Sequence, residues 1–203
     1  MAKQTNQSMI SETSICNQAL SWLGQTRITS LEDPGTTAEW CRDNYPFIRD
    51  AVLEERMWTF AQAREVSTVS EKSPWGDRYQ HPIPLGWLAV YRVFRDEHGQ
   101  KSCEWSREGR FILTRESTVY LWGLQRIVDT GAFTSLFSQA VAARLAAEMA
   151  IPITENPKMQ ADMWALYQAK LADAATRDGQ QGANERIRSN SLINARGGGY
   201  SWP

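Results

Sequence analysis

Apolar residues at helical spacing mark the first part of the chain. Between positions 15 and 23 they recur on one face of a predicted helix, and Gly24 is a natural end for it. Ser11 or Thr13 can accept a hydrogen bond from the free amides of its first turn. The sequence therefore predicts an amphipathic helix with one buried stripe.

A second helical pattern follows a turn-rich linker. Thr36 and Glu39 have the T-x-x-E spacing of a capping box, and apolar residues between positions 41 and 52 share one face. Pro46 removes an amide donor inside this pattern, so we expect a kink or two abutting helices there. The segment should end around positions 57–60.

The period of the pattern changes between residues 64 and 127. Residues 65–70 alternate at the spacing of a strand, and residues 87–95 are rich in aromatic and branched side chains. Turn sequences at 96–99 and 107–109 separate the following predicted strands, which are 103–105, 110–114 and 118–122. Connections this short join antiparallel strands, so we expect an antiparallel meander.

Two further helices are predicted after the strands. The first begins near Thr130, carries alanines that let another helix approach closely, and is ended by Pro152. The second runs from about 156 to 177, and Asp178 and Gly179 terminate it.

The remaining residues, 179–203, have many glycines and polar residues and no sustained period. In isolation such a segment should be extended or disordered. Arginine, aromatic and aliphatic residues are interleaved in it, which favours a segment that orders on a partner. The candidate partner-binding residues are Arg186, Ile187, Arg188, Leu192, Ile193, Arg196, Tyr200 and Trp202.

The pattern as a whole predicts an α+β fold, mainly a helical bundle with a small antiparallel β region and an extended C-terminal tail. We expect one domain over residues 1–178, with helices at about 11–60 and 130–177 and the β region at about 64–127. The tail is 179–203. The nine tryptophans favour an aromatic-rich core, with subunit contacts as the alternative.

Composition restricts the partners of such a chain. With 22 basic and 23 acidic side chains the net charge is -1, so no bulk attraction to nucleic acid or to an anionic membrane is expected. A possible stripe along the second helix is formed by Arg42, Arg49, Arg56 and Arg64, of which the first three are the candidate channel-facing residues, but acidic residues are interleaved with them. A mixed helical surface is the simpler interpretation, although in a ring the same stripe could face the lumen.

Cysteine usage and hydropathy indicate the compartment. Cys16, Cys41 and Cys103 are odd in number and far apart, which favours buried free thiols in a protein made in a reducing cytoplasm. No apolar run approaches the roughly 18 residues that span a bilayer, and the polar start lacks the apolar stretch of a secretory signal. We therefore expect a soluble protein that does not contact a membrane.

Templates for catalysis and for cofactor binding are not matched. The two histidines lack metal-ligand spacing, and no phosphate loop, dinucleotide fingerprint or nucleophile elbow is present, so no metal, cofactor or catalytic residue is predicted. Paired carboxylates remain open as an alternative. Glu104 with Glu108, or Asp96 with Glu97, could serve a tail-associated glycan hydrolase, although acidic residues are also ordinary in turns. Cys103 has only His98 nearby as a base and is better explained as a buried strand residue.

Several stretches carry a family resemblance. Residues 14–33 (SICNQALSWLGQTRITSLED), 45–64 (YPFIRDAVLEERMWTFAQAR) and 137–154 (FSQAVAARLAAEMAIPIT) resemble the tail tubular protein A family of short-tailed bacteriophages. The second stretch is the most specific of the three. Residues 191–196 (SLINAR) are similar to the family's S-W-x-x-A-R close, with Leu192 where tryptophan is usual.

The resemblance implies a structural virion protein and not an enzyme. Its members are head-to-tail adaptors (connectors), so we expect a dodecameric ring between the portal and the tail nozzle, a tail tubular protein B type. Viral DNA would pass through its channel during ejection. The C-terminal tail would reach into the portal and the β region would face the nozzle. The protein would be made in the host cytoplasm and reside in the virion, at the head-tail junction.

Overall fold

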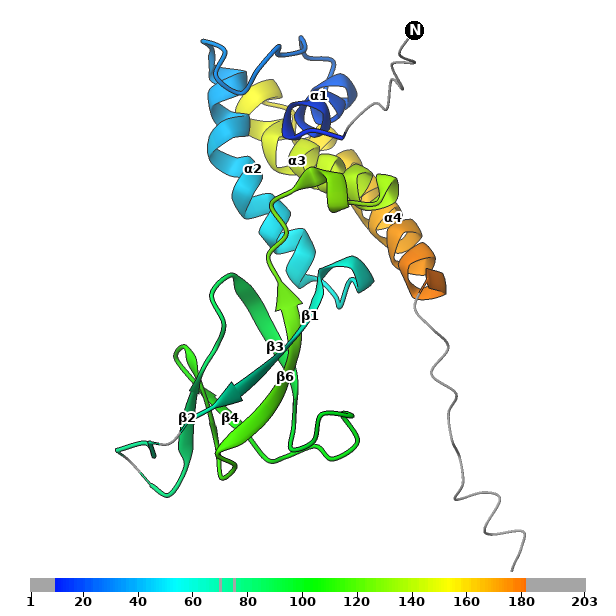
Figure 1. Ribbon diagram of the computed structural model, residues 1–203. Coiled ribbons are helices and arrows are strands. Elements are labelled where there is room, and N and C mark those ends of the chain that lie inside the picture. Colours follow the sequence, from blue (N-terminus) through cyan, green and yellow to red (C-terminus); the bar gives the residue numbers. More distant parts are fainter. Residues whose placement is uncertain (1–9, 70, 75, 182–203) are drawn as a thin grey trace, which may run out of the picture.

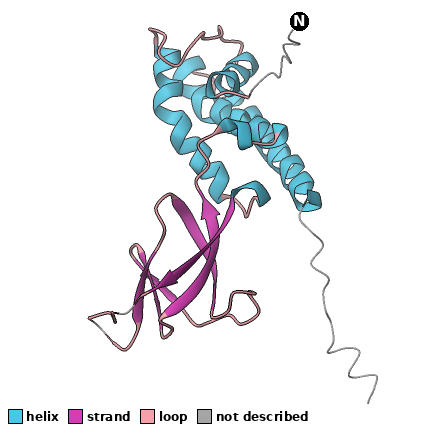
Figure 2. Cartoon of the chain, viewed as in Figure 1, coloured by secondary structure: helices cyan, strands magenta, loops and turns pink. Residues whose placement is uncertain are grey.

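The computed structural model describes residues 10–69, 71–74 and 76–181 of the 203-residue chain (Figure 1). It has a bundle of α-helices at one end and a β region at the other, which confirms the α+β class (Figure 2). The chain leaves the helices after α2, builds the β region, and returns to the bundle through α3 and α4.

Helix α1 (Glu12–Trp22) begins where the sequence predicts. Ser11 is its N-cap, and its hydroxyl accepts a hydrogen bond from the Ser14 amide at 3.1 Å. The Ser14 hydroxyl accepts from the Ser11 amide in return, at 2.9 Å, so two free donors of the first turn are satisfied. The chain turns away after Leu23 at Gly24, whose φ of +68° favours glycine.

Helix α2 (Thr36–Glu54) differs from its prediction at both ends. The predicted capping box is not formed, because Thr36 is already helical and Gly35, with no side chain to offer, is the N-cap. The helix ends at Glu54, and a 3-10 turn, η1 (Thr59–Ala61), leads into the strands. Pro46 does not divide the helix in two. It is exposed, so the backbone carbonyl that it leaves without a donor can be solvated.

Helix α3 (Ser135–Thr154) lies in the middle of the bundle and packs against the other three helices. A 3-10 turn, η2 (Thr130–Ala132), precedes it where the helix itself was expected, and Thr134 is its N-cap. Pro152 does not end it, since the helix continues to Thr154 and stops at Glu155, which has a left-handed backbone (φ 53°). Its buried alanines allow close approach: Ala140, Ala142, Ala143, Ala146, Ala147 and Ala150.

The same helix corrects an expectation about hydropathy. Among the described residues, α3 is long and apolar enough to span a bilayer by length and composition, with a mean hydropathy of 1.2 over 18 residues. However, 61% of that window is buried inside the protein. Its apolar character is therefore accounted for by its central place in the helical core.

The β region contains two three-stranded antiparallel sheets, in the orders β1-β6-β3 and β2-β5-β4. The expected meander is wrong, because β6 pairs with both β1 and β3 and so brings the last strand between two earlier ones. The strand expected at 103–105 begins later, at Ser106, and the hairpin turns at Gly109, whose φ is +57°. The strands are β1 (Gln62–Thr68), β2 (Tyr79–Pro82), β3 (Trp87–Phe94), β4 (Ser106–Glu108), β5 (Phe111–Thr114) and β6 (Thr118–Gln125).

The described part of the chain has two hydrophobic cores. The larger one fills the helical bundle and includes Leu124, at the end of β6 nearest the helices. The smaller one lies between the two sheets and is formed by Ile83, Val93, Cys103, Ile112, Val119 and Leu121. The β region therefore has a core of its own, joined to the bundle at one end.

Helix α4 (Pro157–Gln181) begins as predicted and ends later than predicted. Asn156 precedes it, and its side chain accepts hydrogen bonds from the amides of Lys158 and Met159 at 3.1 Å. Asp178 does not stop the helix, because its carboxylate is buried against η1, and Gly179 continues the helical backbone. The division expected between 178 and 179 thus falls inside α4.

Candidate partner-binding surface

An aromatic cluster joins the helical bundle to the β region. Trp58, which follows α2, has no exposed surface, and its Nε1 donates to the Val52 carbonyl at 3.0 Å. Its ring packs edge to face against Phe137 of α3, with 5.0 Å between the centroids, and Phe60 contacts both rings. Because this cluster lies between the end of α2 and the start of β1, it fixes how the β region leaves the bundle.

Among the described tryptophans, Trp58 alone is fully buried. The others lie at the surface with part of the ring covered: Trp22, Trp40, Trp87, Trp105, Trp122 and Trp164.

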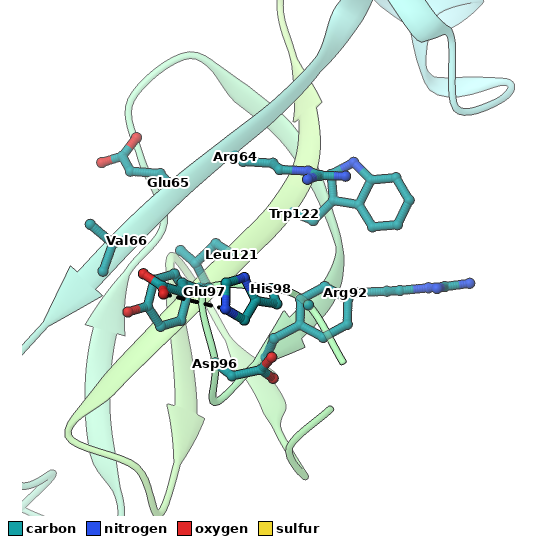
Figure 3. Close-up of a pocket in the computed structure, with 12 residues that line it drawn as sticks. Arg64, Glu65, Val66, Arg92, Asp96, Glu97, His98, Leu121 and Trp122 are labelled. Atoms are coloured by element: carbon teal, nitrogen blue, oxygen red, sulfur yellow. Dashed lines mark ion pairs between the residues drawn. The ribbon is translucent and has the colours of Figure 1, made fainter. Parts of the chain in front are cut away.

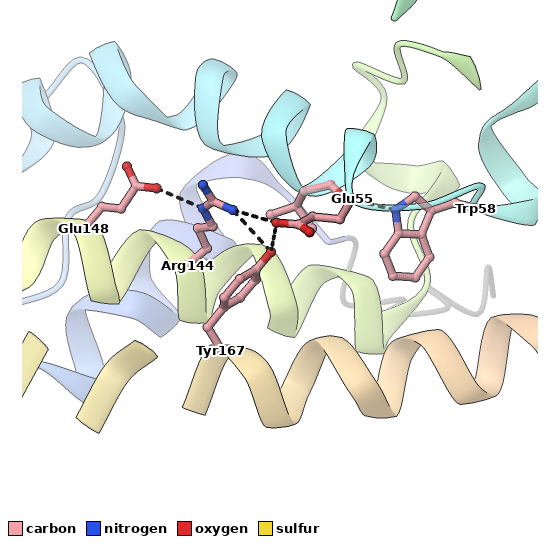
Figure 4. Close-up of polar contacts among 6 residues, drawn as sticks. Glu55, Trp58, Arg144, Glu148 and Tyr167 are labelled. Atoms are coloured by element: carbon pink, nitrogen blue, oxygen red, sulfur yellow. Dashed lines mark hydrogen bonds and ion pairs between the residues drawn. The ribbon is translucent and has the colours of Figure 1, made fainter. Parts of the chain in front are cut away.

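A polar network lies beside this joint (Figure 4). Arg144 of α3 donates from Nη1 to Glu55 at 3.0 Å and from Nε to Glu148 at 2.9 Å. Tyr167 of α4 donates its hydroxyl to Glu55 at 3.2 Å, and the Arg144 guanidinium lies 5.3 Å from the Tyr167 and Trp164 ring centroids. The network ties the end of α2 to both later helices.

The pKa values of this network follow its geometry. Burial disfavours the charged form of Arg144, but hydrogen bonds with Glu148 and Tyr167 outweigh it and raise its pKa. Burial also raises the pKa of Tyr167, against the hydrogen bond with Arg144 that lowers it. Both groups therefore keep their ordinary protonation states at neutral pH, and the network is a structural one.

The exposed face of the β1-β6-β3 sheet carries a row of three side chains (Figure 3). Trp122 of β6 pairs with Arg64 of β1 on one side and with Arg92 of β3 on the other. The two guanidinium carbons lie 5.2 and 5.3 Å from the Trp122 ring centroid, within the range of a cation-π contact. Both arginines are nonetheless exposed to solvent.

A second row on the same face forms an apolar floor. This row consists of Val66, Tyr120 and Phe94, each two residues along its strand from a member of the first row. Tyr120 pairs in register with both Val66 and Phe94. Val66 is 56% exposed. The two rows and the loop at 96–99 enclose a groove of about 330 Å³.

The loop side of the groove carries acidic residues that are already engaged. Asp96 accepts hydrogen bonds from the amides of Gln100, at 3.0 Å, and Lys101, and the Gln100 bond is the main cause that lowers the pKa of Asp96. Glu97 lies 3.5 Å from His98. These contacts stay within the turn at 96–101, and neither Arg64 nor Arg92 takes part in them.

The predicted arginine stripe of α2 does not form one exposed row. Arg42 is exposed and lies 3.3 Å from Asp43. Arg49 is only 5% exposed and bonds Asp50 at 2.8 Å. Arg56 lies beyond the helix end, half-buried, with its guanidinium 5.3 Å from the Trp58 ring centroid, and Arg64 lies in β1 and not on the helix. Burial therefore removes Arg49 from any surface that could face a channel in a ring of such subunits.

The predicted tail residues Arg186, Ile187, Arg188, Leu192, Ile193, Arg196, Tyr200 and Trp202 lie outside the described residues.

The carboxylates and the cysteine considered for catalysis lie in the β region. Glu104 and Glu108 are exposed, and Glu104 lies 4.0 Å from Arg78. Cys103 is buried, its Sγ donates to the Val93 carbonyl at 3.7 Å, and burial raises the pKa of its thiol. A thiol in this state is a packing residue of the inter-sheet core.

The sequence did not predict the row of Arg64, Trp122 and Arg92, because the row depends on strand order. The three residues are far apart in sequence, and a meander would not have set β6 between β1 and β3. The signal available was that Arg64, Arg92 and Trp122 each stand two positions from an apolar or aromatic residue, which is the spacing of one strand face. The chain matches no protein-family model and no curated protein sequence.

Proposed function

We propose that the chain is a structural virion protein, a head-to-tail adaptor subunit of a short-tailed phage. In this proposal, copies of the chain form a ring, a dodecamer by the family resemblance, between the portal and the tail nozzle. Viral DNA passes through the channel of the ring. The resemblance of residues 14–33, 45–64 and 137–154 to tail tubular protein A supports the assignment.

One observation carries the proposal furthest: residues 10–181, where the structure describes them, form two hydrophobic cores. The helical bundle and the β region each bury their own apolar side chains, and they meet at one end of each. A subunit that must contact one partner above and another below benefits from two modules held at a fixed joint. The aromatic cluster around Trp58 and the Arg144 network supply that joint.

Charge supports passage of DNA without retention. The chain has a net charge of -1, and arginines along α2 are paired with acidic neighbours such as Asp43 and Asp50. A strongly basic lumen would displace the counterions of the DNA and bind its phosphates tightly, and this binding would oppose ejection. A near-neutral subunit avoids that cost.

Removal of residues 186–203 tests the proposal. The cut lies beyond Gln181, the last residue of α4, so the bundle and the β region should stay folded, with unchanged circular dichroism and melting temperature. The shortened chain should fail to join portal particles in sedimentation, whereas the full chain should co-sediment with them. Equal docking of the two chains would contradict the proposal.

A further inference from the structure

We propose that the groove on the exposed face of the β1-β6-β3 sheet binds an acidic segment of a partner protein. Arg64 and Arg92 would hold its carboxylates, and an apolar side chain of the same segment would enter the groove beside Trp122 (Figure 3). The inference does not rest on the adaptor proposal, because it concerns the chemistry of one surface whatever assembly contains it.

The two arginines are free to take an anionic ligand. Among the described residues neither has an acidic partner, and the one contact of each guanidinium is with the Trp122 ring. Several other described arginines already form ion pairs with carboxylates, as Arg126 does with Asp50 at 2.7 Å. Guanidinium groups present a planar fork of donors that matches a carboxylate, so each arginine can make a bidentate bond.

Stacking on the indole prepares both arginines for binding. A free arginine side chain loses rotamer freedom when it binds, which weakens the complex. Here the strands on either side of β6 hold both guanidinium groups within 5.3 Å of the Trp122 centroid before any ligand arrives. The loss of side-chain entropy on binding is therefore partly avoided.

Two further features of the groove favour a protein ligand. The indole Nε1–H of Trp122 is covered and has no hydrogen-bond partner among the described residues. A ligand acceptor that draws one guanidinium aside would satisfy it. The floor of Val66, Tyr120 and Phe94 offers apolar contact, and a groove of about 330 Å³ accommodates one or two side chains.

Charge around the groove disfavours nucleic acid as the occupant. Glu65, Asp96 and Glu97 line the same groove and would repel a continuous run of phosphates. A protein segment has one or two carboxylates at chosen places and apolar side chains between them, so it can meet the arginines and avoid these acids. Two arginines and an apolar floor match that pattern better than they match a polyanion.

Fluorescence anisotropy with a defined probe tests the inference on the full chain. The probe is a fluorescein-labelled peptide that carries two carboxylates, one Asp and one Glu, separated by Leu and Phe, and it is compared with the same peptide carrying Asn and Gln. The acidic probe should bind at least about 10-fold more tightly, because charge-assisted bonds are stronger than neutral ones. The preference should shrink as salt is raised from 50 to 300 mM, concentrations chosen to screen exposed charges.

Matched variants locate the binding. Arg64→Gln with Arg92→Gln should weaken binding of the acidic probe at least about 10-fold, since both charge-assisted contacts are lost. Arg110→Gln with Arg115→Gln removes the same charge from two exposed residues of the β region outside this groove and should change affinity less than about 2-fold. Arg64→Lys with Arg92→Lys keeps the charge and loses the planar fork, so its affinity should fall between these two.

Three results would overturn the inference. The first is equal affinity for the acidic and amide probes, or no binding of either. The second is an equal loss of affinity for the acidic probe in the two glutamine double variants. The third is tighter binding of a single-stranded DNA oligonucleotide than of the acidic peptide. All variants alter exposed side chains, and unchanged melting temperatures confirm that affinity differences do not come from unfolding.

Discussion

Asp178, near the end of α4, accepts a hydrogen bond from the Thr59 hydroxyl at 2.6 Å. Both of its carboxylate oxygens also lie 3.1 Å from the Thr59 amide nitrogen. The residues are 119 positions apart, and Asp178 is 3% exposed. Thr59 begins the turn between α2 and β1, so this contact links the last described helix directly to the joint of the β region. In an adaptor, force on the end of α4 would reach the β region through it.

The first prediction concerns this link. Asp178→Ala leaves the amide and hydroxyl of the half-buried Thr59 without their acceptor, and it should lower the free energy of unfolding by about 1–3 kcal/mol. Asp178→Asn keeps one acceptor and should cost less. Urea denaturation measures both, with Asp173→Ala on the exposed side of α4 as the control. Equal stability of the alanine variant and the wild type would show that the link contributes nothing.

The second prediction concerns Tyr45 and alkaline pH. Its hydroxyl is buried without a hydrogen-bond partner among the described residues. Burial, reinforced by the charge of Glu12 and opposed by that of Arg49, raises its pKa above the ordinary value of 10.0. The unfolded chain then ionises first, so stability is complete below about pH 10 and falls as the pH rises above it.

Tyr45→Phe should remove that part of the pH dependence. At pH 7 it should also leave stability unchanged or raise it by about 1 kcal/mol, because an unpaired buried hydroxyl is lost. Denaturation at pH 7 and at about pH 10.5 separates the two effects. Tyr167, whose pKa is also raised, should keep some alkaline sensitivity in the variant. A variant as alkali-sensitive as the wild type and less stable at pH 7 would refute this explanation.

The third prediction compares two glycines. At Gly123 of β6 a Cβ would lie 2.2 Å from the Ala89 carbonyl oxygen and 2.6 Å from the Trp87 ring. Since backbone cannot give way easily, Gly123→Ala should destabilise the β region by about 2–3 kcal/mol. At Gly179 nothing lies within 4 Å, and Gly179→Ala should stabilise α4 by about 0.5–1 kcal/mol. Thermal unfolding measures both, and the same sign for the two would contradict the packing described.

The fourth prediction concerns the Arg144 network. Arg144→Met keeps much of the aliphatic volume but leaves Glu55 and Glu148 without their cation, and should destabilise the fold by about 1–3 kcal/mol. Arg177→Met, at an exposed site of α4, is the matched control and should be neutral. Differential scanning calorimetry compares them, and similar melting temperatures would mean that the network is not structural.

The local pattern of the sequence predicted the helices well. The N-cap at Ser11, the stop at Gly24 and the alanines of α3 all follow from neighbouring residues, and these are the features that the structure confirms. Errors of a few residues arise where tertiary contacts decide. Asp178 has the chemistry of a helix end, yet Thr59, far away in sequence, holds it inside α4.

Strand order and the candidate groove could not be predicted from local pattern. The insertion of β6 between β1 and β3 depends on pairing across more than 50 residues, which no turn residue specifies. The Arg64, Trp122 and Arg92 row exists only in that order. Burial of Arg49 is likewise a tertiary outcome, because a charged residue on a helix is ordinarily expected in solvent.

The proposed adaptor is a subunit of a ring that docks on a portal. Electron microscopy of the full chain mixed with the portal protein of the same phage tests it most directly. We expect closed rings of the chain seated on one end of the portal, with the β regions pointing away from it. Portal particles that remain bare while the chain stays monomeric at excess concentration would contradict it.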